Sequence, residues 1–418
     1  MVLRRYGRAV FSCRRIVWPV PLAALALVVA ACGSSGGSSS SSGGGGTAGG
    51  SESAYTLACL GDFSGPLGFS GLPVRNGFET YVASVNKAGG VDGHKVNVLA
   101  LDDTDNVTTG KTNYEQAVSS HALGTFCENG GIWASLAPFA APGNTMQMGL
   151  AVTDNYTDPV HPYIYRATFG SIGLAQEQIG FVKYLISQGK LPPDPTVGLI
   201  YFTDVVTQGM DTYFQTALKQ LGWKIVADQQ FPLTATSATT QSSAVASAKP
   251  DVVLSMLTDP SGLFVDRELR QQGFKGPDVE FTGANGVSTF QSLDDPEYFS
   301  QSVFAYPGDT EVPAAVTELQ QSKTFGFTQS NTSSFFSAGY VMAIVAIAAL
   351  KKCGNGCNSV SYNEALNDLG TVNVFGLAPG VSITPSDHQI VNSGQFYVWD
   401  SAKNAVVKAG PPITVTSK

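Results

Sequence analysis

One short loop in the sequence has residue types suited to binding a small polar molecule. It is Cys127-Glu128-Asn129-Gly130-Gly131, between a predicted strand and a predicted helix. Glycines ahead of a helix leave backbone N–H groups free at its positively polarised end, which suits a ligand carboxylate or amide oxygen. The same glycines could serve only a tight strand–helix turn, and Glu128 could cap the helix instead of lining a site. The first chemistry indicated is therefore binding.

Other acidic residues lie where predicted strands end. The run Asp102-Asp103-Thr104-Asp105 lacks the glycine and the distal glutamate of a calcium loop, so we expect solvated strand-end acids and helix caps. Asp204 and Asp259 follow later strands. Both are candidates for a ligand site, although a structural role is favoured for each.

No combination of residues predicts catalysis. An enzyme needs a nucleophile with a base and an orienting group, or a cluster of metal ligands. The sequence has no Gly-x-Ser-x-Gly, P-loop, Gly-x-Gly-x-x-Gly or paired-histidine helix pattern. Its four histidines are scattered: His94, His121, His161 and His388. We therefore expect a binding protein that is not an enzyme and that needs no metal or cofactor.

Strand and helix patterns alternate through residues 54–418. The β-prone runs are Tyr55–Leu60, Val96–Leu101, Leu123–Cys127, Thr196–Phe202, Asp251–Leu257 and Val279–Thr282. Between them, apolar residues recur at helical spacing, as in Gln176–Ser187 and Met210–Leu221. This alternation predicts an α/β fold with two lobes, each a doubly wound parallel sheet. Such sheets bind ligands beyond the carboxyl ends of their strands, so a site is expected in a cleft between the lobes.

One predicted helix is apolar on nearly every side. Residues 335–350 read FFSAGYVMAIVAIAAL, and Ser337, Gly339 and Tyr340 lie within this stretch. A membrane-spanning helix needs about 20 apolar residues. A buried helix of a globular domain is therefore the favoured interpretation.

The N-terminus has the pattern of an export signal. Five arginines (Arg4, Arg5, Arg8, Arg14 and Arg15) precede an apolar stretch over 16–31, which ends in Val29-Ala30-Ala31-Cys32. This ending resembles the cleavage box of bacterial lipoproteins, in which the cysteine carries the lipid. An ordinary signal peptide with a chance cysteine is the alternative. Residues 33–53 are mostly glycine and serine, and such a flexible tether spans roughly 25 Å. We therefore expect residues 1–31 to be a signal peptide, and 32–53 to anchor the exported body to the outer face of the cytoplasmic membrane.

Composition and the remaining cysteines fit an exported globular protein. The chain has 32 Asp and Glu against 24 Lys and Arg, five of which lie in the leader. This acidic balance argues against nucleic acid and against electrostatic docking on anionic lipid. Four cysteines remain after export, which suggests two disulfides. Cys353 and Cys357 could close a small loop, whereas Cys59 and Cys127 lie near the ends of predicted strands; the alternative of a metal site at Cys353 and Cys357 lacks a second pair of ligands.

Several stretches together resemble the leucine/isoleucine/valine-binding protein family. They are GDFSGPLGFSGLPVRNGFETYVASVNKAGGVDGHKV (61–96), Asp102-Asp103, YIYRATFGS (163–171), DVVLSMLTDP (251–260) and EFTGANG (280–286). The resemblance covers essentially all of residues 55–418. It implies the type I periplasmic binding protein fold and a monomeric solute receptor that delivers a small polar molecule to the permease of an ABC importer. A lipid-anchored sensor that signals through a membrane partner is the alternative.

The resemblance also implies where the chain passes between the lobes. The expected crossings lie near 169–171, 303–306 and 375–377. The N-terminal lobe would then comprise 54–170 and 304–375, and the C-terminal lobe 171–303 and 376–418.

By alignment, the resemblance assigns nine residues to the ligand site, and Asp204 joins them because it follows a predicted strand. The nine are Glu128, Asn129, Gly130, Asn155, Tyr156, Thr157, Val206, Thr258 and Asn285. Val206 and Thr258 stand where the family has cleft tyrosines, and Asn285 stands where it has the glutamate that pairs with the ligand ammonium. Glu128 replaces a small hydroxyl residue that faces the ligand carboxylate. Because a buried unpaired charge costs several kcal/mol, these departures make a neutral amide, a polyol-like solute or a cation credible alongside an amino acid.

Overall fold

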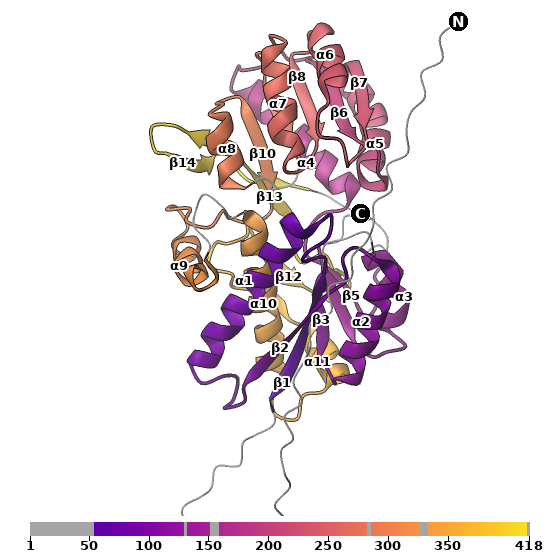
Figure 1. Cartoon of the computed structure of the whole chain (residues 1–418), viewed down its shortest axis with the longest axis vertical. Helices are drawn as coiled ribbons and strands as arrows, with labels where there is room; N and C mark the ends of the chain where they lie inside the picture. Colours follow the sequence, from indigo (N-terminus) through magenta and orange to yellow (C-terminus); the bar gives the residue numbers. More distant parts are fainter. Residues whose placement is uncertain (1–53, 129–131, 151–158, 282–285, 327–332, 416–418) are drawn as a thin grey trace, which may run out of the picture. The chain divides into compact units, whose positions relative to one another are not determined.

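The computed structural model describes residues 54–415, apart from 129–131, 151–158, 282–285 and 327–332 (Figure 1). The proposed lipidation site Cys32 and its tether lie outside the described residues. Two separate α/β sheets, each with its own helices, account for most of the rest. We call each sheet with its helices a lobe.

The first sheet has five parallel strands in the order β2-β1-β3-β4-β5. These strands are β1 (Tyr55–Gly61), β2 (Val96–Asp102), β3 (Gly124–Glu128), β4 (Met146–Gly149) and β5 (Ile164–Arg166). The helices that accompany it are α1 (Gly68–Lys87), α2 (Val107–Ser119), α3 (Trp133–Ala140), α9 (Pro313–Ser322), α10 (Ser334–Cys353) and α11 (Ser359–Asn367). The strands and helices expected from the sequence in this region are confirmed.

Both faces of the first sheet are covered, because alternate residues of a strand point to opposite sides. In β1, Leu57 and Cys59 pack into the cluster that contains α1 and α10. Ala58 and Leu60 pack instead against α2 and α3. The continuous apolar sequence of β1 therefore follows from its central, doubly covered position.

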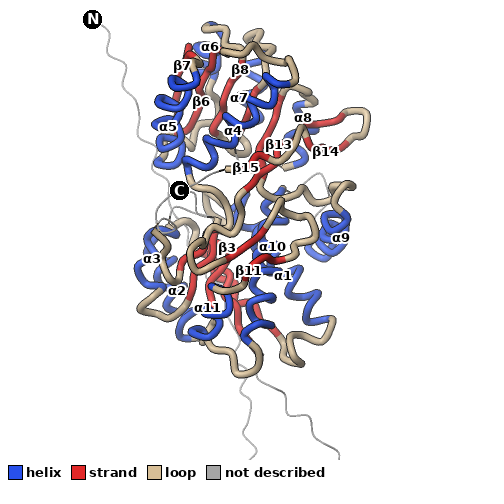
Figure 2. Tube along the Cα trace, turned by 180° about the vertical axis from the view of Figure 1, so that it is seen from behind, coloured by secondary structure: helices blue, strands red, loops and turns tan. Residues whose placement is uncertain are grey.

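The second sheet follows the order β14-β13-β10-β9-β8-β6-β7, and β15 pairs with β13 (Figure 2). Its parallel strands are β6 (Thr196–Phe202), β7 (Lys224–Phe231), β8 (Val252–Met256), β9 (Asp278–Glu280) and β10 (Tyr298–Ser302). Helices α4 (Ser171–Ser187), α5 (Val205–Leu221), α6 (Thr239–Ser247), α7 (Ser261–Gln271) and α8 (Val287–Leu293) accompany these strands. The expected doubly wound parallel arrangement is confirmed for this part of the sheet.

The end of the second sheet departs from the expectation of parallel strands. β13 (Ser393–Asp400) runs antiparallel to β10, and β14 (Ala405–Lys408) forms a hairpin with β13. The short strand β15 (Ile413–Thr414) adds a second antiparallel pairing. A tight turn allows antiparallel neighbours, whereas a parallel pair needs a longer crossover, so the sheet ends in a hairpin.

The chain changes sheets three times. The first change lies between β5 and α4, and the second follows directly after β10. The third lies later than the predicted 375–377. The backbone N–H of Ile390 still donates to the carbonyl of Arg166 in β5 at 2.9 Å, and the chain joins the second sheet only at Ser393. Residues 388–390 therefore still pair with β5 of the first sheet, and the division of the chain into the two lobes stays a prediction.

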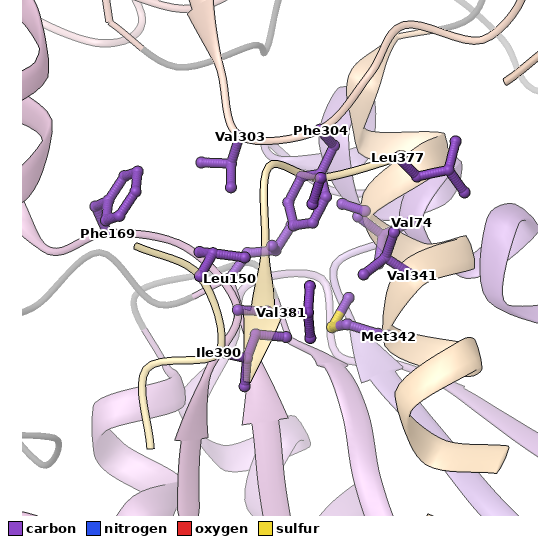
Figure 3. Close-up of a cluster of buried hydrophobic side chains, with 14 of the residues drawn as sticks. Val74, Leu150, Phe169, Val303, Phe304, Val341, Met342, Leu377, Val381 and Ile390 are labelled. Atoms are coloured by element: carbon purple, nitrogen blue, oxygen red, sulfur yellow. The ribbon is translucent and has the colours of Figure 1, made fainter. Parts of the chain in front are cut away.

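The connecting segments pack on the first lobe through apolar side chains (Figure 3). Their buried members include Phe169, Val303, Phe304, Leu377 and Ile390, and their partners include Val74 of α1 and Val341 and Met342 of α10. A third sheet of only two strands, β11 (Gly370–Val372) and β12 (Val381–Ile383), supports the last connection. Each connection is thus anchored in the core.

Helix α10 is buried, as its composition predicted. It contacts α1, α9, α11 and β3. Within the described part of the chain, it is the one helix long and apolar enough to cross a membrane, and 83% of its most apolar window is buried inside the fold. Burial in the core accounts for its apolar character.

Both predicted disulfides are present. Cys59 of β1 is bonded to Cys127 of β3, with their Cα atoms 5.1 Å apart on adjacent strands. Cys353 at the end of α10 is bonded to Cys357, with a Cα separation of 5.6 Å. The first bond lies directly before Glu128, so it restrains the strand end that carries this residue.

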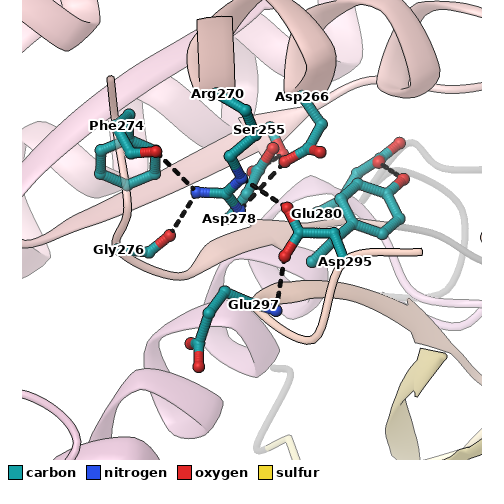
Figure 4. Close-up of polar contacts among 10 residues, drawn as sticks. Ser255, Asp266, Arg270, Phe274, Gly276, Asp278, Glu280, Asp295 and Glu297 are labelled. Carbon is teal, nitrogen blue, oxygen red and sulfur yellow. Dashed lines mark hydrogen bonds and ion pairs between the residues drawn. The ribbon is translucent and has the colours of Figure 1, made fainter. Parts of the chain in front are cut away.

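A buried ionic network lies between helix α7 and the start of strand β9 (Figure 4). The Arg270 guanidinium pairs with Asp266 at 3.1 Å and with Asp295 at 2.5 Å, and it donates to the carbonyl of Gly276 at 2.7 Å. Nearby, the Ser255 hydroxyl donates to Asp278 at 2.5 Å. Asp266 and Asp278 are each 1% exposed, so their polar partners come from the protein and not from water.

Candidate functional site

The residues predicted to bind ligand follow the carboxyl ends of strands in both sheets. In the first lobe, the loop after β1 is held by two carboxylates, Asp62 within the loop and Asp102 at the end of the neighbouring strand β2. Asp62 accepts the backbone N–H groups of Gly65 at 2.5 Å and Leu67 at 2.7 Å. Asp102 accepts the N–H of Phe63 at 3.0 Å and the Ser64 hydroxyl at 2.5 Å. This loop is therefore fixed before any ligand arrives.

Gly65 is required by the close packing of this loop. A Cβ atom at this position would lie 2.8 Å from the Asp62 carboxylate and 2.9 Å from the carbonyl oxygen of Thr104. The pattern Asp62-x-x-Gly65 is visible in the sequence but was not among the predicted site residues. An aspartate whose carboxylate binds backbone N–H groups a few residues ahead is the feature that identifies such a turn.

Asp103 is fully buried, whereas the sequence analysis expected solvated acids here. Its carboxylate accepts the N–H of Asp105 at 2.9 Å. Burial raises the pKa of Asp103 to about 6, and the nearby acids Asp62 and Asp105 add to this effect. Hydrogen bonds from the Asp105 N–H and the Glu128 side chain act in the opposite direction. Asp103 and Glu128 are therefore neighbouring carboxyl groups that can share a proton.

Glu128 is the last residue of β3 and is 5% exposed. Its backbone carbonyl accepts the N–H of Leu150 at 2.7 Å, which joins the end of β3 to the segment after β4. The side chain lies beside Asp103, and helix α3 begins five residues later at Trp133. Asn129 and Gly130, the next two predicted site residues, lie outside the described residues.

In the second lobe, Asp204 caps helix α5. Its carboxylate accepts the N–H groups of Val206 at 2.8 Å and Thr207 at 3.0 Å. The Val206 side chain packs against the apolar core, while Val205 beside it is 76% exposed. The structural role favoured for Asp204 is thus observed, and Val205, the first residue of α5, is an exposed apolar residue that was not among the predicted site residues.

Thr258 and Asp259 follow β8 at the same edge of the second sheet. The Thr258 carbonyl accepts the N–H of Ser261 at 2.7 Å and so begins helix α7. The Asp259 carboxylate accepts the N–H of Gly286 at 2.7 Å and the Thr289 hydroxyl at 2.6 Å. Burial raises the pKa of Asp259, while these two hydrogen bonds act to lower it. Asp259 therefore joins the loop after β8 to the loop after β9.

The remaining predicted site residues, Asn155, Tyr156, Thr157 and Asn285, lie outside the described residues. Among the described residues, no group of three or more His, Cys, Asp or Glu side chains could hold a metal ion. In the first lobe, the described residues bring together the carboxyl groups of Asp103 and Glu128. In the second lobe, the Asp259 carboxylate joins the loops after β8 and β9. Neither arrangement contains a nucleophile paired with a base.

Comparisons with known proteins place this geometry in a family. The family model described as "Periplasmic binding protein" matches residues 54–404. A protein of Brucella suis described as "Leu/Ile/Val-binding protein homolog 7" is 25% identical over 323 residues, which cover 74% of this chain and 80% of that protein.

Solved structures share the fold at lower sequence identity. A branched-chain amino acid ABC transporter protein from Thermus thermophilus with bound valine superposes with a TM-score of 0.76 at 17% identity, covering 88% of this chain and 98% of that chain. A fatty acid ABC transporter substrate-binding protein from Thermomonospora curvata gives a TM-score of 0.72 at 16% identity. The superposition covers 88% of this chain and 94% of that chain. At these identities, the structural likeness supports the fold alone.

Proposed function

The chain belongs to the periplasmic binding protein family, and from this premise we propose that it is the substrate-binding subunit of an ABC importer and not an enzyme. The match over residues 54–404, which spans both sheets, is the observation that carries the proposal. In this function the lobes close around a small polar solute and present it to the permease. The loops after the parallel strands supply the contacts, as in other open α/β sheets.

The ligand class follows from the acids at the end of the first sheet. Asp62, Asp102, Asp103 and Glu128 place carboxyl groups there, and Glu128 stands where the resemblance predicted a small hydroxyl residue. A ligand carboxylate beside Glu128 would be repelled, whereas an ammonium or amide N–H group would be attracted. We therefore assign to Glu128 the nitrogen end of an amino acid, an amide or a similar solute. Asn129, Gly130, Asn155, Tyr156, Thr157, Val206, Thr258 and Asn285 remain the proposed neighbours of this ligand, and Asp204 supports them as a helix cap.

A thermal-shift screen of amino acids, amides, short peptides and polyols tests the function. At a ligand concentration of about 100 times Kd, binding stabilises the folded state by about 2.7 kcal/mol. For a body of this length, we expect a rise in Tm of roughly 3–4 °C. Glu128→Gln removes the charge but keeps the shape, so shifts caused by amines should shrink while shifts caused by neutral amides persist.

The controls separate the ligand class from the function itself. Glu115→Gln, on the exposed side of α2, removes the same charge far from the proposed site and should respond like the native chain. Equal shifts in the native chain and Glu128→Gln would dismiss the role of Glu128 but leave the binding function intact. A folded protein with no shift across the whole library would count against the solute receptor.

We also propose that the chain is exported and held at the outer face of the cytoplasmic membrane by a lipid on Cys32. Cys32→Ala should move the protein from the membrane fraction to the soluble fraction, because the acyl chains bury many CH₂ groups at ~0.8 kcal/mol each. Cys13→Ala, in the same leader, is the matched control and should leave the protein in the membrane fraction. Membrane retention of Cys32→Ala, measured by fractionation and immunoblotting, would contradict the anchor.

A further inference from the structure

The start of helix α8 is held by one carboxylate. Both oxygens of Asp259 are occupied, one by the N–H of Gly286 at 2.7 Å and the other by the Thr289 hydroxyl at 2.6 Å. Gly286 is the residue before α8, and Thr289 lies in its first turn. Two contacts of this kind fix both the position and the direction of the helix start.

The same glycine contacts the other lobe. Gly286 and Ser333 form an isolated antiparallel β-bridge, and Ser333 is the residue before α10. Helix α8 packs with α7, β13 and β14 of the second lobe, whereas α10 packs with α1, α9 and α11 of the first. This bridge therefore joins the beginnings of two helices that belong to different lobes.

The contact on the α10 side is made by the backbone. Ser333 is 5% exposed, and its hydroxyl has no hydrogen-bond partner within the described part of the chain. It does not cap the helix through its side chain. The first N–H groups of a helix have no partner inside it, so they exchange quickly with solvent unless another segment covers them. At α10, the bridge to Gly286 is made by Ser333, the residue directly before the first turn.

We propose that Asp259 is a positioning residue for lobe closure: it holds Gly286 where its backbone pairs with Ser333, so that the starts of α8 and α10 form a clasp between the lobes. The proposal rests on the proposed function only in that the lobes of a solute receptor open and close. The clasp itself is a contact between described residues. Asp259 acts through Gly286 and is not assigned a contact with the ligand.

Hydrogen exchange measured by mass spectrometry on the full chain, without ligand, tests the clasp. In Asp259→Ala, we expect exchange to become about tenfold faster in peptides from the first turn of α8 and from the first turn of α10. The α8 effect follows from lost contacts within the second lobe. The α10 effect requires the clasp, because the hydrogen bonds of Asp259 go to Gly286 and Thr289 and not to α10. Faster exchange in α8 with native exchange in α10 would overturn the proposal.

A pair of substitutions at Gly286 provides a second test that does not depend on the folding of Asp259→Ala. Gly286 has φ −69°, which proline adopts without strain, so Gly286→Pro removes the N–H that Asp259 accepts; proline also restricts the backbone of the preceding residue. Gly286→Ala keeps this N–H. We expect faster exchange at the start of α10 in Gly286→Pro and native exchange in Gly286→Ala. If Gly286→Pro leaves α10 at the native rate, the positioning role is excluded. Because no ligand is added, a failed ligand screen would leave this result unaffected.

Discussion

Replacing Gly339 by alanine is expected to lower the free energy of unfolding by about 3 kcal/mol. A Cβ atom on Gly339 would lie 1.8 Å from the carbonyl oxygen of Val74 and 3.0 Å from the N atom of Phe78, both in α1. The reverse contact exists as well, because a Cβ on Gly77 would lie 1.9 Å from the carbonyl oxygen of Phe336 in α10. Backbone atoms cannot rotate away, so α1 and α10 would have to separate by roughly 1 Å and open the core around them.

Urea unfolding followed by circular dichroism measures this loss. Gly110→Ala in α2 is the matched control, because the added Cβ would meet only the flexible end of the Ile132 side chain, at 2.5 Å. Alanine also gains about 1 kcal/mol of helix propensity over glycine, which favours the substitution at Gly110. Gly77→Ala should cost as much as Gly339→Ala, and the double variant less than the sum, because separating the helices relieves both clashes. A Gly339→Ala protein as stable as Gly110→Ala would refute the close helix contact.

The protein is expected to lose stability as the pH rises from about 5 to about 8. Five buried carboxyl groups cause this. Burial raises the pKa of Asp103 and Asp278 to about 6 and that of Asp266 to about 8, and it raises the pKa of Glu177 and Glu318 well above the ordinary range. In each case the folded state holds its proton to a higher pH than the unfolded chain does.

The sign follows from proton linkage. Between the unfolded and folded pKa values the folded state binds more protons, so the free energy of unfolding falls by about 1.4 kcal/mol per pH unit for each such group. This contribution is complete below the unfolded pKa near 4 and is lost as the pH rises through the folded pKa. Burial lowers the pKa of His388, so this residue makes the free energy of unfolding rise with pH below pH 6.5. It is a single group, so it offsets only part of the loss caused by the carboxyl groups.

Urea unfolding at pH 5, 6, 7 and 8 tests this pH dependence, and we expect a loss of at least about 2 kcal/mol over the range. Glu318→Gln should flatten the profile, because the amide keeps an acceptor for the Ser337 hydroxyl and cannot ionise. Glu177→Gln should act in the same way beside Gln301, whose side chain donates to it at 2.5 Å. Glu115→Gln removes an exposed carboxylate and should leave the slope unchanged. Stability that rises toward pH 8 would show that these acids are ionised in the folded protein.

Local sequence patterns were sufficient for six of the parallel strands and for the α/β fold class. β6 lies at Thr196–Phe202, as expected, because a continuous apolar run between polar turns fits only a strand covered on both faces. The burial of α10 also follows from its composition. The Cys59–Cys127 bond was only a possibility from the sequence, because it depends on β1 and β3 being adjacent in the sheet. These features depend on neighbours in the sequence or on adjacent strands.

The tertiary structure alone decided which distant groups meet. Nothing in the sequence around Asp103 or Glu128 shows that their carboxyl groups are neighbours, because the contact depends on the order of β2, β1 and β3 in the sheet. The late return of the chain to the second sheet at Ser393 depends in the same way on hydrogen bonds between Arg166 and Ile390. The contact of Gly286 with Ser333 joins the two lobes, and these residues are 47 positions apart in the sequence. Such contacts are set by the packing of whole elements, because the free energy of burying their faces exceeds any preference of the few residues that happen to touch.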